Sequence, residues 1–334
     1  MLNNISTVHW GILGTARIAE KVAAAIHKAN AAELTAVASR SGQRAAAWAS
    51  EYGVTRSYGS YAELLNDSQL DAIYIPLPPS MHAEWTIKAA EKGKHVLCEK
   101  PLAMNAGEAR EMAAACRENN VQLMDGVMWV HHPRAVEMLK PIQDGTLGTL
   151  RRVTSALTFN WDEIPVGDLR LQRELGGGSM LDLGWYCVRV TLWAFGELPK
   201  RVFGNARYDN DVDRNFSAIL FYDDERMATF DSGFDVGMRK WVEVAGTKSS
   251  LICDDFTKPW DESRPRFWIH DVSGKNAEHV TAAPIQEVRM IEEMCGIIRT
   301  GSLENRWPQE AINTQRVCDA LDQSARKGEW VGVK

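Results

Sequence analysis

Short, mostly apolar runs alternate with longer amphipathic stretches over the first part of the chain. A short apolar run between turn residues is typical of a strand buried on both faces of a parallel sheet. The alanine-rich stretches between the runs favour helices that pack closely on such a sheet. The pattern predicts strands at Val8–Leu13, Leu34–Ser39, Ala72–Ile75, His95–Glu99 and Gln122–Val127, joined by helices at Ala16–Ala29, Gln43–Tyr52, Met81–Lys92 and Ala106–Asn119.

After Pro133 the apolar and polar residues alternate over longer segments, with turn signals at Asp223-Asp224 and Gly246. Such alternation is typical of antiparallel strands with one covered face. We therefore expect the α/β class, with a parallel α/β domain followed, near Val130, by an α+β domain that has a large, mostly antiparallel open sheet. The predicted strands are Arg152–Trp161, Arg201–Tyr208, Asn215–Tyr222, Met227–Phe234, Lys240–Val244 and Arg266–His270, and the helices are Ser179–Phe195, Ile285–Arg299 and Pro308–Lys327.

The composition fits two globular domains: 334 residues, of which 45% are hydrophobic and 25% charged. The formal net charge of -6 provides no overall positive field for a nucleic-acid backbone or an anionic membrane. No apolar run reaches the ~20 residues that a bilayer span requires. The six cysteines are dispersed and lack zinc-site spacing, so we expect buried thiols, no metal site and a cytoplasmic location.

The first predicted strand leads directly into a turn with two glycines and then into a helix. Glycine is needed where the backbone approaches a pyrophosphate, whose charge is then bound by the N–H groups of the helix N-terminus. A tight strand-to-helix turn with no ligand is the alternative. Because both the strand and the helix flank this turn, we predict a dinucleotide loop that involves Gly11, Gly14, Thr15, Ala16, Arg17 and Ile18.

The second predicted strand ends at Ser39 and Arg40, where the adenosine ribose of a bound dinucleotide would lie. A carboxylate at this place binds the 2′-hydroxyl of NAD. A hydroxyl followed by a guanidinium suits a 2′-phosphate instead, since arginine forms paired, charge-assisted bonds with phosphate oxygens. We therefore expect NADP as the cofactor, with NAD as the alternative and a solvated loop arginine as the explanation without a ligand.

Lys100 follows the predicted strand His95–Glu99, at the carboxyl edge of the parallel sheet, where open α/β domains bind ligands. Pro101 keeps this lysine out of helical geometry and permits a cis peptide bond. Residues 98–101 read Cys-Glu-Lys-Pro, and residues 75–82 read Ile-Pro-Leu-Pro-Pro-Ser-Met-His. Together with the dinucleotide loop, these segments resemble the glucose-fructose oxidoreductase, inositol dehydrogenase and MocA family.

The resemblance covers nearly the whole chain. Residues 175–186 look like the family's glycine-rich approach to its active-site helix, and the chain from Val317 is similar to its C-terminal helix and final strand. It implies a Rossmann NAD(P)-binding domain at residues 1–129 and an α+β substrate-binding and oligomerisation domain at residues 130–334. It also implies a homodimer or homotetramer that forms through the C-terminal sheet. Sugar and dihydrodiol dehydrogenases are the most similar members in motif.

The same resemblance implies that Lys100 lies beside the nicotinamide and that Tyr186 transfers the proton. Physical chemistry supports both roles, because a carbinol carbon releases hydride only as its hydroxyl loses a proton, and a nearby positive charge stabilises the alkoxide. A helix aromatic buried between the domains is the alternative for Tyr186. The resemblance further implies cofactor contacts by Leu77, Pro78, His82, Glu99 and Lys100, with packing at a helix N-terminus as the alternative for His82.

Asp182 is the third expected catalytic residue, on the same helix face as Tyr186 four residues later. It also follows Ser179 by three residues, so a Ser-x-x-Asp capping box is its structural alternative. Arg170 binds a substrate hydroxyl or carboxylate, or pairs with Glu174 four residues later.

Trp161 and Trp185 are expected to pack against a sugar or aromatic ring, although large aromatics often belong to the core.

The chain departs from the family pattern at Pro79, Asp125 and Val130. None of these departures removes the hydride chemistry, but they prevent us from assigning the substrate of any one family member to this chain. We predict an NAD(P)-dependent oxidoreductase that transfers a hydride to or from a secondary or anomeric carbon of a sugar, sugar derivative or cyclic diol. One alternative is a non-catalytic dinucleotide-binding regulator, against which Lys100 and Tyr186 argue. Another is a glycoside-cleaving enzyme with a tightly held cofactor.

Overall fold

The structure is a computed structural model that describes residues 6–161 and 163–334. It divides into two compact units. The first comprises residues 6–131 together with Pro284–Ile312, and the second comprises His132–Ala283 together with Asn313–Lys334. The division lies two residues beyond the boundary expected at Val130, but residues 284–312, which the sequence assigned to the second domain, return to the first.

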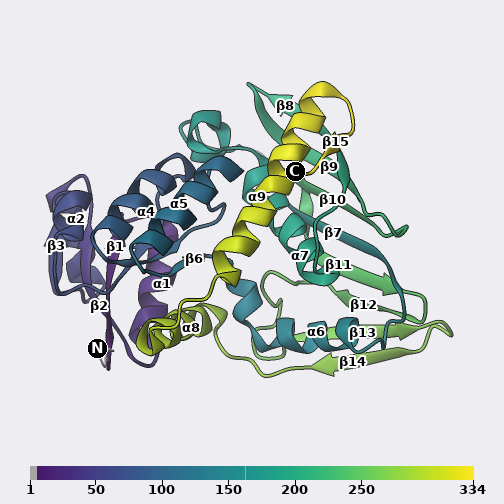
Figure 1. Ribbon diagram of the computed structural model, residues 1–334, viewed down its shortest axis with the longest axis horizontal. Helices are drawn as coiled ribbons and strands as arrows, with labels where there is room; N and C mark the ends of the chain where they lie inside the picture. Colours follow the sequence, from purple (N-terminus) through teal and green to yellow (C-terminus); the bar gives the residue numbers. More distant parts are fainter. Residues whose placement is uncertain (1–5, 162) are drawn as a thin grey trace. The chain divides into compact units, whose positions relative to one another are not determined.

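The first unit is built on a parallel sheet with the strand order β3-β2-β1-β4-β5-β6 (Figure 1). The chain moves outward from β1 in one direction and then returns to its other side, so the order reverses between β1 and β4. Ligands of open α/β sheets bind at the carboxyl ends of the strands near such a reversal. The strands are β1 (Val8–Leu13), β2 (Ala32–Ala38), β3 (Arg56–Tyr58), β4 (Ala72–Ile75), β5 (His95–Cys98) and β6 (Leu123–Asp125).

Helices join these strands, and the expected Rossmann fold is confirmed. Helix α8 (Gln286–Thr300) packs on α1 from the far end of the sequence. Its Met290 and Ile291 are fully buried in one cluster with Trp10 and Ile26, which explains why this segment belongs to the first unit. The other helices are α1 (Arg17–Lys28), α2 (Gly42–Glu51), α3 (Tyr61–Leu65), α4 (His82–Glu91) and α5 (Ala106–Glu118).

The second unit is built on a large sheet with the order β14-β13-β12-β11-β7-β10-β9-β8-β15. Its neighbouring strands are antiparallel, apart from the parallel pair β7 and β10. The expected mostly antiparallel sheet is thus confirmed. The strands are β7 (Leu150–Asn160), β8 (Arg201–Asp209), β9 (Val212–Phe221), β10 (Met227–Gly233), β11 (Asp235–Gly246), β12 (Ser249–Cys253), β13 (Arg266–Asp271), β14 (Asn276–Val280) and β15 (Val331–Gly332).

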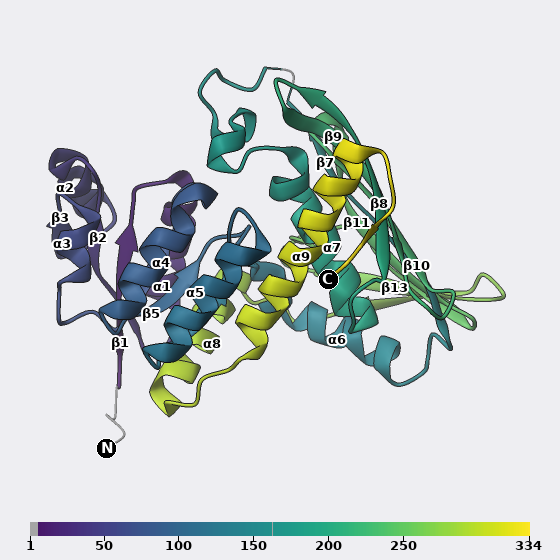
Figure 2. The same ribbon diagram turned by 45° about the horizontal axis from the view of Figure 1, so that its top comes forward.

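Helices cover one face of this sheet (Figure 2). Helix α7 (Trp185–Phe195) packs on β7 and β10. The part of α9 (Arg306–Lys327) that belongs to this unit lies close to β8, where Ser324 accepts a hydrogen bond of 3.0 Å from the backbone N–H of Gly204. Helix α6 (Pro133–Gln143) packs near β13.

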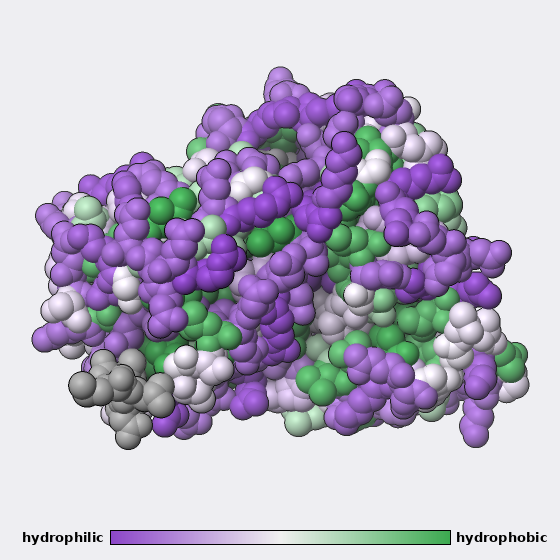
Figure 3. Space-filling view, in the orientation of Figure 1, coloured by the Kyte–Doolittle hydropathy of each residue, from purple (hydrophilic) through white to green (hydrophobic). Residues whose placement is uncertain are grey.

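The surface carries both hydrophilic and hydrophobic residues. On the face shown in Figure 3, hydrophilic residues dominate and hydrophobic residues show between them in patches, one of them around β12 and β13. Across residues 6–161 and 163–334, no helix combines the length and apolar character that crossing a bilayer would take. All six cysteines are buried and free of disulfides, as expected.

Candidate active site

The turn after β1 has the geometry of a dinucleotide loop. Gly14 has a φ of +110°, a conformation that favours glycine, and its N–H donates to the carbonyl of Ala38 at 2.8 Å. Helix α1 then begins at Arg17, and its N-cap residue Ala16 provides no side-chain cap. The N–H of Ala19 donates to the carbonyl of Ala16 at 2.8 Å, and no side chain caps the N–H groups before it, an arrangement that fits the pyrophosphate of a dinucleotide.

Gly11 also has a packing reason to be glycine. It lies inside β1, and a Cβ there would come within 2.8 Å of Leu70 and 2.9 Å of Leu64. Its lack of a side chain thus allows these leucines to pack on the strand.

Ser39 and two arginines lie just beyond β2. The hydroxyl oxygen of Ser39 accepts hydrogen bonds from the Ser41 N–H at 3.3 Å and from Nε of Arg44 at 3.2 Å. With both lone pairs engaged, the hydroxyl has its own proton left to donate. Arg40 is exposed beside it. This group of one donor hydroxyl and two guanidiniums suits a phosphate better than a ribose hydroxyl.

Sequence reasoning missed Arg44. It lies in the first turn of α2, four residues after Arg40, which precedes the helix; a second arginine so close to the end of β2 is the signal that was available.

Lys100 follows β5 at the carboxyl edge of the sheet, and the Lys100–Pro101 peptide bond is cis. Its backbone N–H donates to Glu99 Oε2 at 3.2 Å, and the other oxygen of Glu99 accepts the hydroxyl of Tyr74 at 2.6 Å. Burial raises the pKa of Glu99, although the Tyr74 hydroxyl and the charge of Lys100 lower it. A Cβ at Gly126 would lie 2.9 Å from Glu99, so the glycine makes room for this carboxyl group. Glu99 thus anchors the backbone that presents Lys100.

His82 is fully buried at the start of α4. Its Nε2 lies 2.7 Å from the carbonyl oxygen of Leu77, and its Nδ1 lies 3.0 Å from that of Pro101. Burial lowers the pKa of His82, although the carbonyl groups of Leu77, Pro101 and Leu102, which accept from the ring, raise it. The imidazole thus ties the loop after β4 to the loop after β5. These two contacts favour the packing explanation for His82 over direct contact with the nicotinamide. Leu77 and Pro78 lie on the loop after β4 that His82 contacts.

In the second unit, the three consecutive glycines shape the approach to the helix. A Cβ at Gly177 would lie 2.6 Å from the carbonyl oxygen of Leu169 and 2.7 Å from that of Arg170. The N–H groups of Gly177 and Gly178 donate to the carbonyls of Gln172 (2.9 Å) and Arg170 (3.1 Å). The glycines therefore let the backbone close on the loop that carries Arg170 and fix that loop.

The Ser179 side chain does not form the cap bond of the capping box that was the structural alternative for Asp182. Ser179 makes no cap bond; instead its hydroxyl donates to Asp213 Oδ2 at 2.7 Å, and the N–H of Met180 donates to the same oxygen at 2.7 Å. A carboxylate from β9 therefore binds the start of this helix.

Asp182 binds Arg170 instead. Its Oδ2 accepts Nε of Arg170 at 2.8 Å, and a second nitrogen of the guanidinium donates to Asp168 at 3.2 Å. Burial lowers the pKa of Arg170, but the charges of Asp182 and Asp168 outweigh it and hold the pKa above its usual value. The guanidinium also lies 5.6 Å from the centre of the Trp161 ring. Three residues predicted separately are thus brought together, whereas the ion pairs of Arg170 are formed with Asp168 and Asp182 rather than with Glu174.

The segment that carries Asp182 is a π-helical turn, Met180–Gly184, which continues into α7. Such turns are rare and are frequent at functional sites. Tyr186 lies in the first turn of α7 and is partly exposed. Trp185 is fully buried, which favours the core role that the sequence left open for it.

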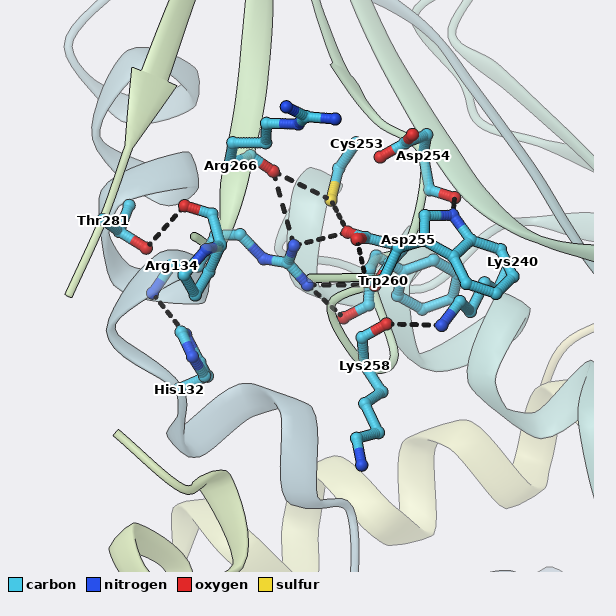
Figure 4. Close-up of polar contacts among 12 residues, drawn as sticks. His132, Arg134, Lys240, Cys253, Asp254, Asp255, Lys258, Trp260, Arg266 and Thr281 are labelled. Carbon is cyan, nitrogen blue, oxygen red and sulfur yellow. Dashed lines mark hydrogen bonds and ion pairs between the residues drawn. The ribbon is translucent and has the colours of Figure 1, made fainter. Parts of the chain in front are cut away.

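A separate polar cluster in the second unit fixes residues 254–260, between β12 and β13 (Figure 4). The buried guanidinium of Arg134 binds the carboxylate of Asp255 and donates to its carbonyl at 2.9 Å. The N–H of Trp260 donates to the same carboxylate, and Lys240 Nζ lies 3.5 Å from the centre of the Trp260 ring. These contacts indicate that the cluster has a structural role and not a catalytic one.

The comparisons with known proteins agree with this geometry. A family model described as an oxidoreductase family with an NAD-binding Rossmann fold matches residues 8–127, and the GFO/IDH/MocA C-terminal domain model matches residues 136–252. An uncharacterized oxidoreductase of Rhizobium meliloti is 34% identical, with 98% of this chain and 99% of the relative covered. The D-xylose 1-dehydrogenase (NADP(+)) 2 of Haloferax volcanii is 33% identical, with 96% and 98% covered.

Solved structures show the same likeness. A 3-ketoreductase from Actinomadura kijaniata in complex with NADP and TDP-benzene has a TM-score of 0.89 at 28% identity, with 95% of this chain and 98% of that chain covered. An aldose-aldose oxidoreductase from Caulobacter crescentus, complexed with glycerol, has a TM-score of 0.89 at 25% identity, with 98% and 99% covered. Family models, relatives and the fold of both units thus agree, and the chain belongs to the GFO/IDH/MocA family of oxidoreductases.

Proposed function

We propose that this protein is an NADP-dependent oxidoreductase that acts on a secondary or anomeric hydroxyl, or the corresponding carbonyl, of a sugar, sugar derivative or cyclic diol. The observation that carries the proposal is the position of Lys100 at the carboxyl edge of the parallel sheet. The loop after β1 and the end of β2, in the same sheet, suit the phosphates of a dinucleotide. A cation at that edge is where an alkoxide requires stabilisation.

The residues of the first unit fit NADP. The uncapped start of α1 suits the pyrophosphate, and Ser39, Arg40 and Arg44 suit the 2′-phosphate. Bound NADP supplies a nicotinamide that accepts or donates the hydride. The NADP in the names of the Haloferax relative and of the Actinomadura structure supports this choice over NAD.

Lys100 and Tyr186 carry the chemistry that we propose. The ammonium group of Lys100 stabilises the negative charge on the substrate oxygen, and Tyr186 exchanges the proton with that oxygen. Asp182 and Arg170 form a charged pair, and a carboxylate and a guanidinium side by side suit the vicinal hydroxyls of a sugar or diol. The ring of Trp161 suits the apolar face of the substrate.

The substrate class follows from this chemistry and from the relatives. Curated relatives include a D-xylose dehydrogenase, reductases of dTDP-keto-deoxyglucose and trans-1,2-dihydrobenzene-1,2-diol dehydrogenases. All of these names describe a ring with neighbouring oxygen substituents. A sugar or cyclic diol is therefore the class to which we assign the substrate.

The proposal also includes an oligomer formed through the second sheet. On the face away from α7, partly exposed apolar side chains lie opposite one another on neighbouring strands, Phe203 beside Ile219 and Ile252 beside Trp268, and such side chains favour cover by another subunit. Light scattering of the purified protein would give a dimer or tetramer, and a monomer would reject this part. The side chains are Phe203, Ile219, Trp241, Ile252 and Trp268.

We also infer a cytoplasmic location from the cysteines. Burial raises the pKa of Cys116, Cys187 and Cys253 to about 12, so these thiols are unreactive and suit a reducing compartment. Fractionation of the native cells would test this inference.

The function is tested by mixing purified protein with NADP or NAD and a panel of D-xylose, D-glucose and trans-1,2-dihydrobenzene-1,2-diol, and following the absorbance of the reduced nicotinamide. We expect reduction of NADP by at least one member, and little with NAD. Lys100→Met is the control for contaminating dehydrogenases. Binding of NADPH without turnover of any sugar or diol, including phosphorylated and nucleotide-linked sugars, would overturn the proposal.

A further inference from the structure

Asp213 lies outside the predicted site, on β9, and is 8% exposed. One of its oxygens, Oδ2, accepts both the hydroxyl of Ser179 and the N–H of Met180, each at 2.7 Å. Its other oxygen lies against Gly178, where any Cβ would collide with it. A single carboxylate therefore contacts three consecutive residues at the start of the π-helical turn.

We propose that Asp213 is a positioning residue for the reaction: its ionised carboxylate holds the start of the segment that carries Asp182 and Tyr186. The inference rests on the proposed function, because it concerns residues that we assign to that reaction. Two charge-assisted hydrogen bonds fix the backbone at Met180, two residues before Asp182. A shift of the segment by about 1 Å is enough to cost about 100-fold in rate when reacting groups must align.

The hairpin turn between β8 and β9 makes further contacts with the glycine-rich segment. Asp211, two residues before Asp213, receives Arg173 Nη1 at 2.7 Å and Arg326 Nη1 at 2.7 Å. Arg173 lies in the loop just before the glycines, so one hairpin contacts the segment on both sides of Gly176–Gly178. The hairpin thus holds the glycine-rich segment at both ends, although the side chain of Ser179 does not cap the helix that follows.

The groups around Asp213 come from several elements. Ser232 on β10 places its hydroxyl 3.4 Å from that of Ser179, and Tyr208 on β8 is paired with Asp213 across the strands. The charge of Asp322 on α9 acts on Asp213, and those of Arg326 on α9 and of Arg173 act on its neighbour Tyr208. Burial, and to a smaller degree Asp322, raise the pKa of Asp213 to about 6, although the bonds from Ser179 and Met180 lower it.

The carboxylate is therefore held ionised at neutral pH at a cost in stability. Since the folded pKa lies above the unfolded one, the folded state gains relative stability as the pH falls through about 6 toward 4, while the charge that fixes Met180 is lost. Stability and positioning thus respond to pH in opposite directions, which separates a positioning role from a merely structural one.

The test is Asp213→Asn in the full chain, which imitates the protonated carboxyl group at every pH. We expect kcat at pH 7.5 to fall about 10- to 100-fold, with the Kd for NADPH unchanged and the melting temperature unchanged or raised. Wild-type kcat falls below about pH 6, and the variant lacks that acid limb. Asp224→Asn, in the exposed turn between β9 and β10, is the matched control.

Amide hydrogen exchange of residues 180–184 provides a readout that needs no substrate. We expect faster exchange in Asp213→Asn and in the wild type at pH 5 than in the wild type at pH 7.5, after correction for the intrinsic pH effect. Ser179→Ala removes one of the two bonds and gives an intermediate effect, and it serves if Asp213→Asn does not fold.

The inference is overturned if the variants keep wild-type exchange at residues 180–184, or if kcat and its acid limb are unchanged. A lowered kcat with an intact acid limb also overturns it. Failure of the proposed function has a different signature: the wild type itself would then reduce no NADP with any sugar or diol.

Discussion

Nε of Arg170 donates to Oδ2 of Asp182 at 2.8 Å, joining a loop residue to the π-helical turn that precedes Tyr186. The pair lies beside Trp161 and is only partly exposed, so both charges are orientated before a substrate arrives. Orientated groups bind hydroxyls without paying the full ordering cost at the moment of binding. The first prediction concerns this pair.

Arg170→Lys keeps the charge but cannot bridge Asp168 and Asp182 with a planar fork. We expect the KM for the sugar to rise about 10-fold or more, from the loss of a charge-assisted hydrogen bond, and the Kd for NADPH to stay the same. Steady-state kinetics measure the first and fluorescence titration the second. Arg151→Lys, in the exposed pair with Glu225 of the same unit, is the matched control. An unchanged KM would remove Arg170 from the substrate site.

The second prediction concerns cofactor choice. Arg40→Met and Arg44→Met each remove a guanidinium beside Ser39, and we expect each to weaken NADPH binding about 10-fold or more while NADH binding changes little. Transfer of tryptophan fluorescence to the nicotinamide measures both affinities. Lys28→Met, an exposed cation at the other end of α1, controls for the loss of charge alone. Equal weakening of NADPH and NADH would show that the arginines do not contact the 2′-phosphate.

The third prediction concerns the buried pair in the second unit. Arg134→Met leaves Asp255 buried without its cation, which costs about 3–5 kcal/mol of unfolding free energy. The exposed pair Glu137–Lys140 on the same helix is the control, and Lys140→Met costs less than about 1 kcal/mol. Urea unfolding followed by tryptophan fluorescence measures both, and similar values for the two variants would contradict the assignment.

The fourth prediction concerns acid lability. Nδ1 of His132 accepts the N–H of Arg134 at 3.0 Å and caps α6, which requires an unprotonated nitrogen. Burial, together with the charge of Arg134, lowers the pKa of His132 to about 4. The unfolded state therefore binds more protons between pH 4 and about 6.5, so this group's stabilisation is complete above about pH 6.5 and is lost toward pH 4.

His132→Asn keeps an acceptor at the cap and removes the titration. The loss of stability between pH 7 and pH 4.5 should therefore be smaller than in the wild type, by about 2 kcal/mol. Thermal unfolding at several pH values measures this slope, with His279→Asn, an exposed histidine of the same unit, as the control. Parallel slopes for wild type and His132→Asn would reject the account.

Local sequence patterns predicted the elements that have strong apolar runs. Val8–Leu13 and Ala72–Ile75 have the bounds that the sequence indicated, because both are buried strands between clear turns. The edge strand β14 was missed because all five of its residues are exposed and no alternation exists to detect. Helix α6 was missed because Pro141 lies inside it, and proline is ordinarily a sign that a helix ends.

The site was predicted where a motif is local and missed where it is not. Gly14, Ser39 and Lys100 lie next to the strands that present them, so their positions follow from the topology. Arg170 and Asp182 are twelve residues apart and meet only because Gly177 lets the backbone close. Asp213 lies 34 residues from Ser179, and no local spacing connects the two.

The central claim is that Lys100 and Tyr186 act on the substrate oxygen during hydride transfer to NADP, and the turnover of Lys100→Met and Tyr186→Phe tests it most directly. With saturating NADP and the substrate that the panel identifies, each variant should lose about 100-fold or more in kcat while its Kd for NADPH stays within about threefold of wild type. Near-normal turnover in either variant would contradict the account.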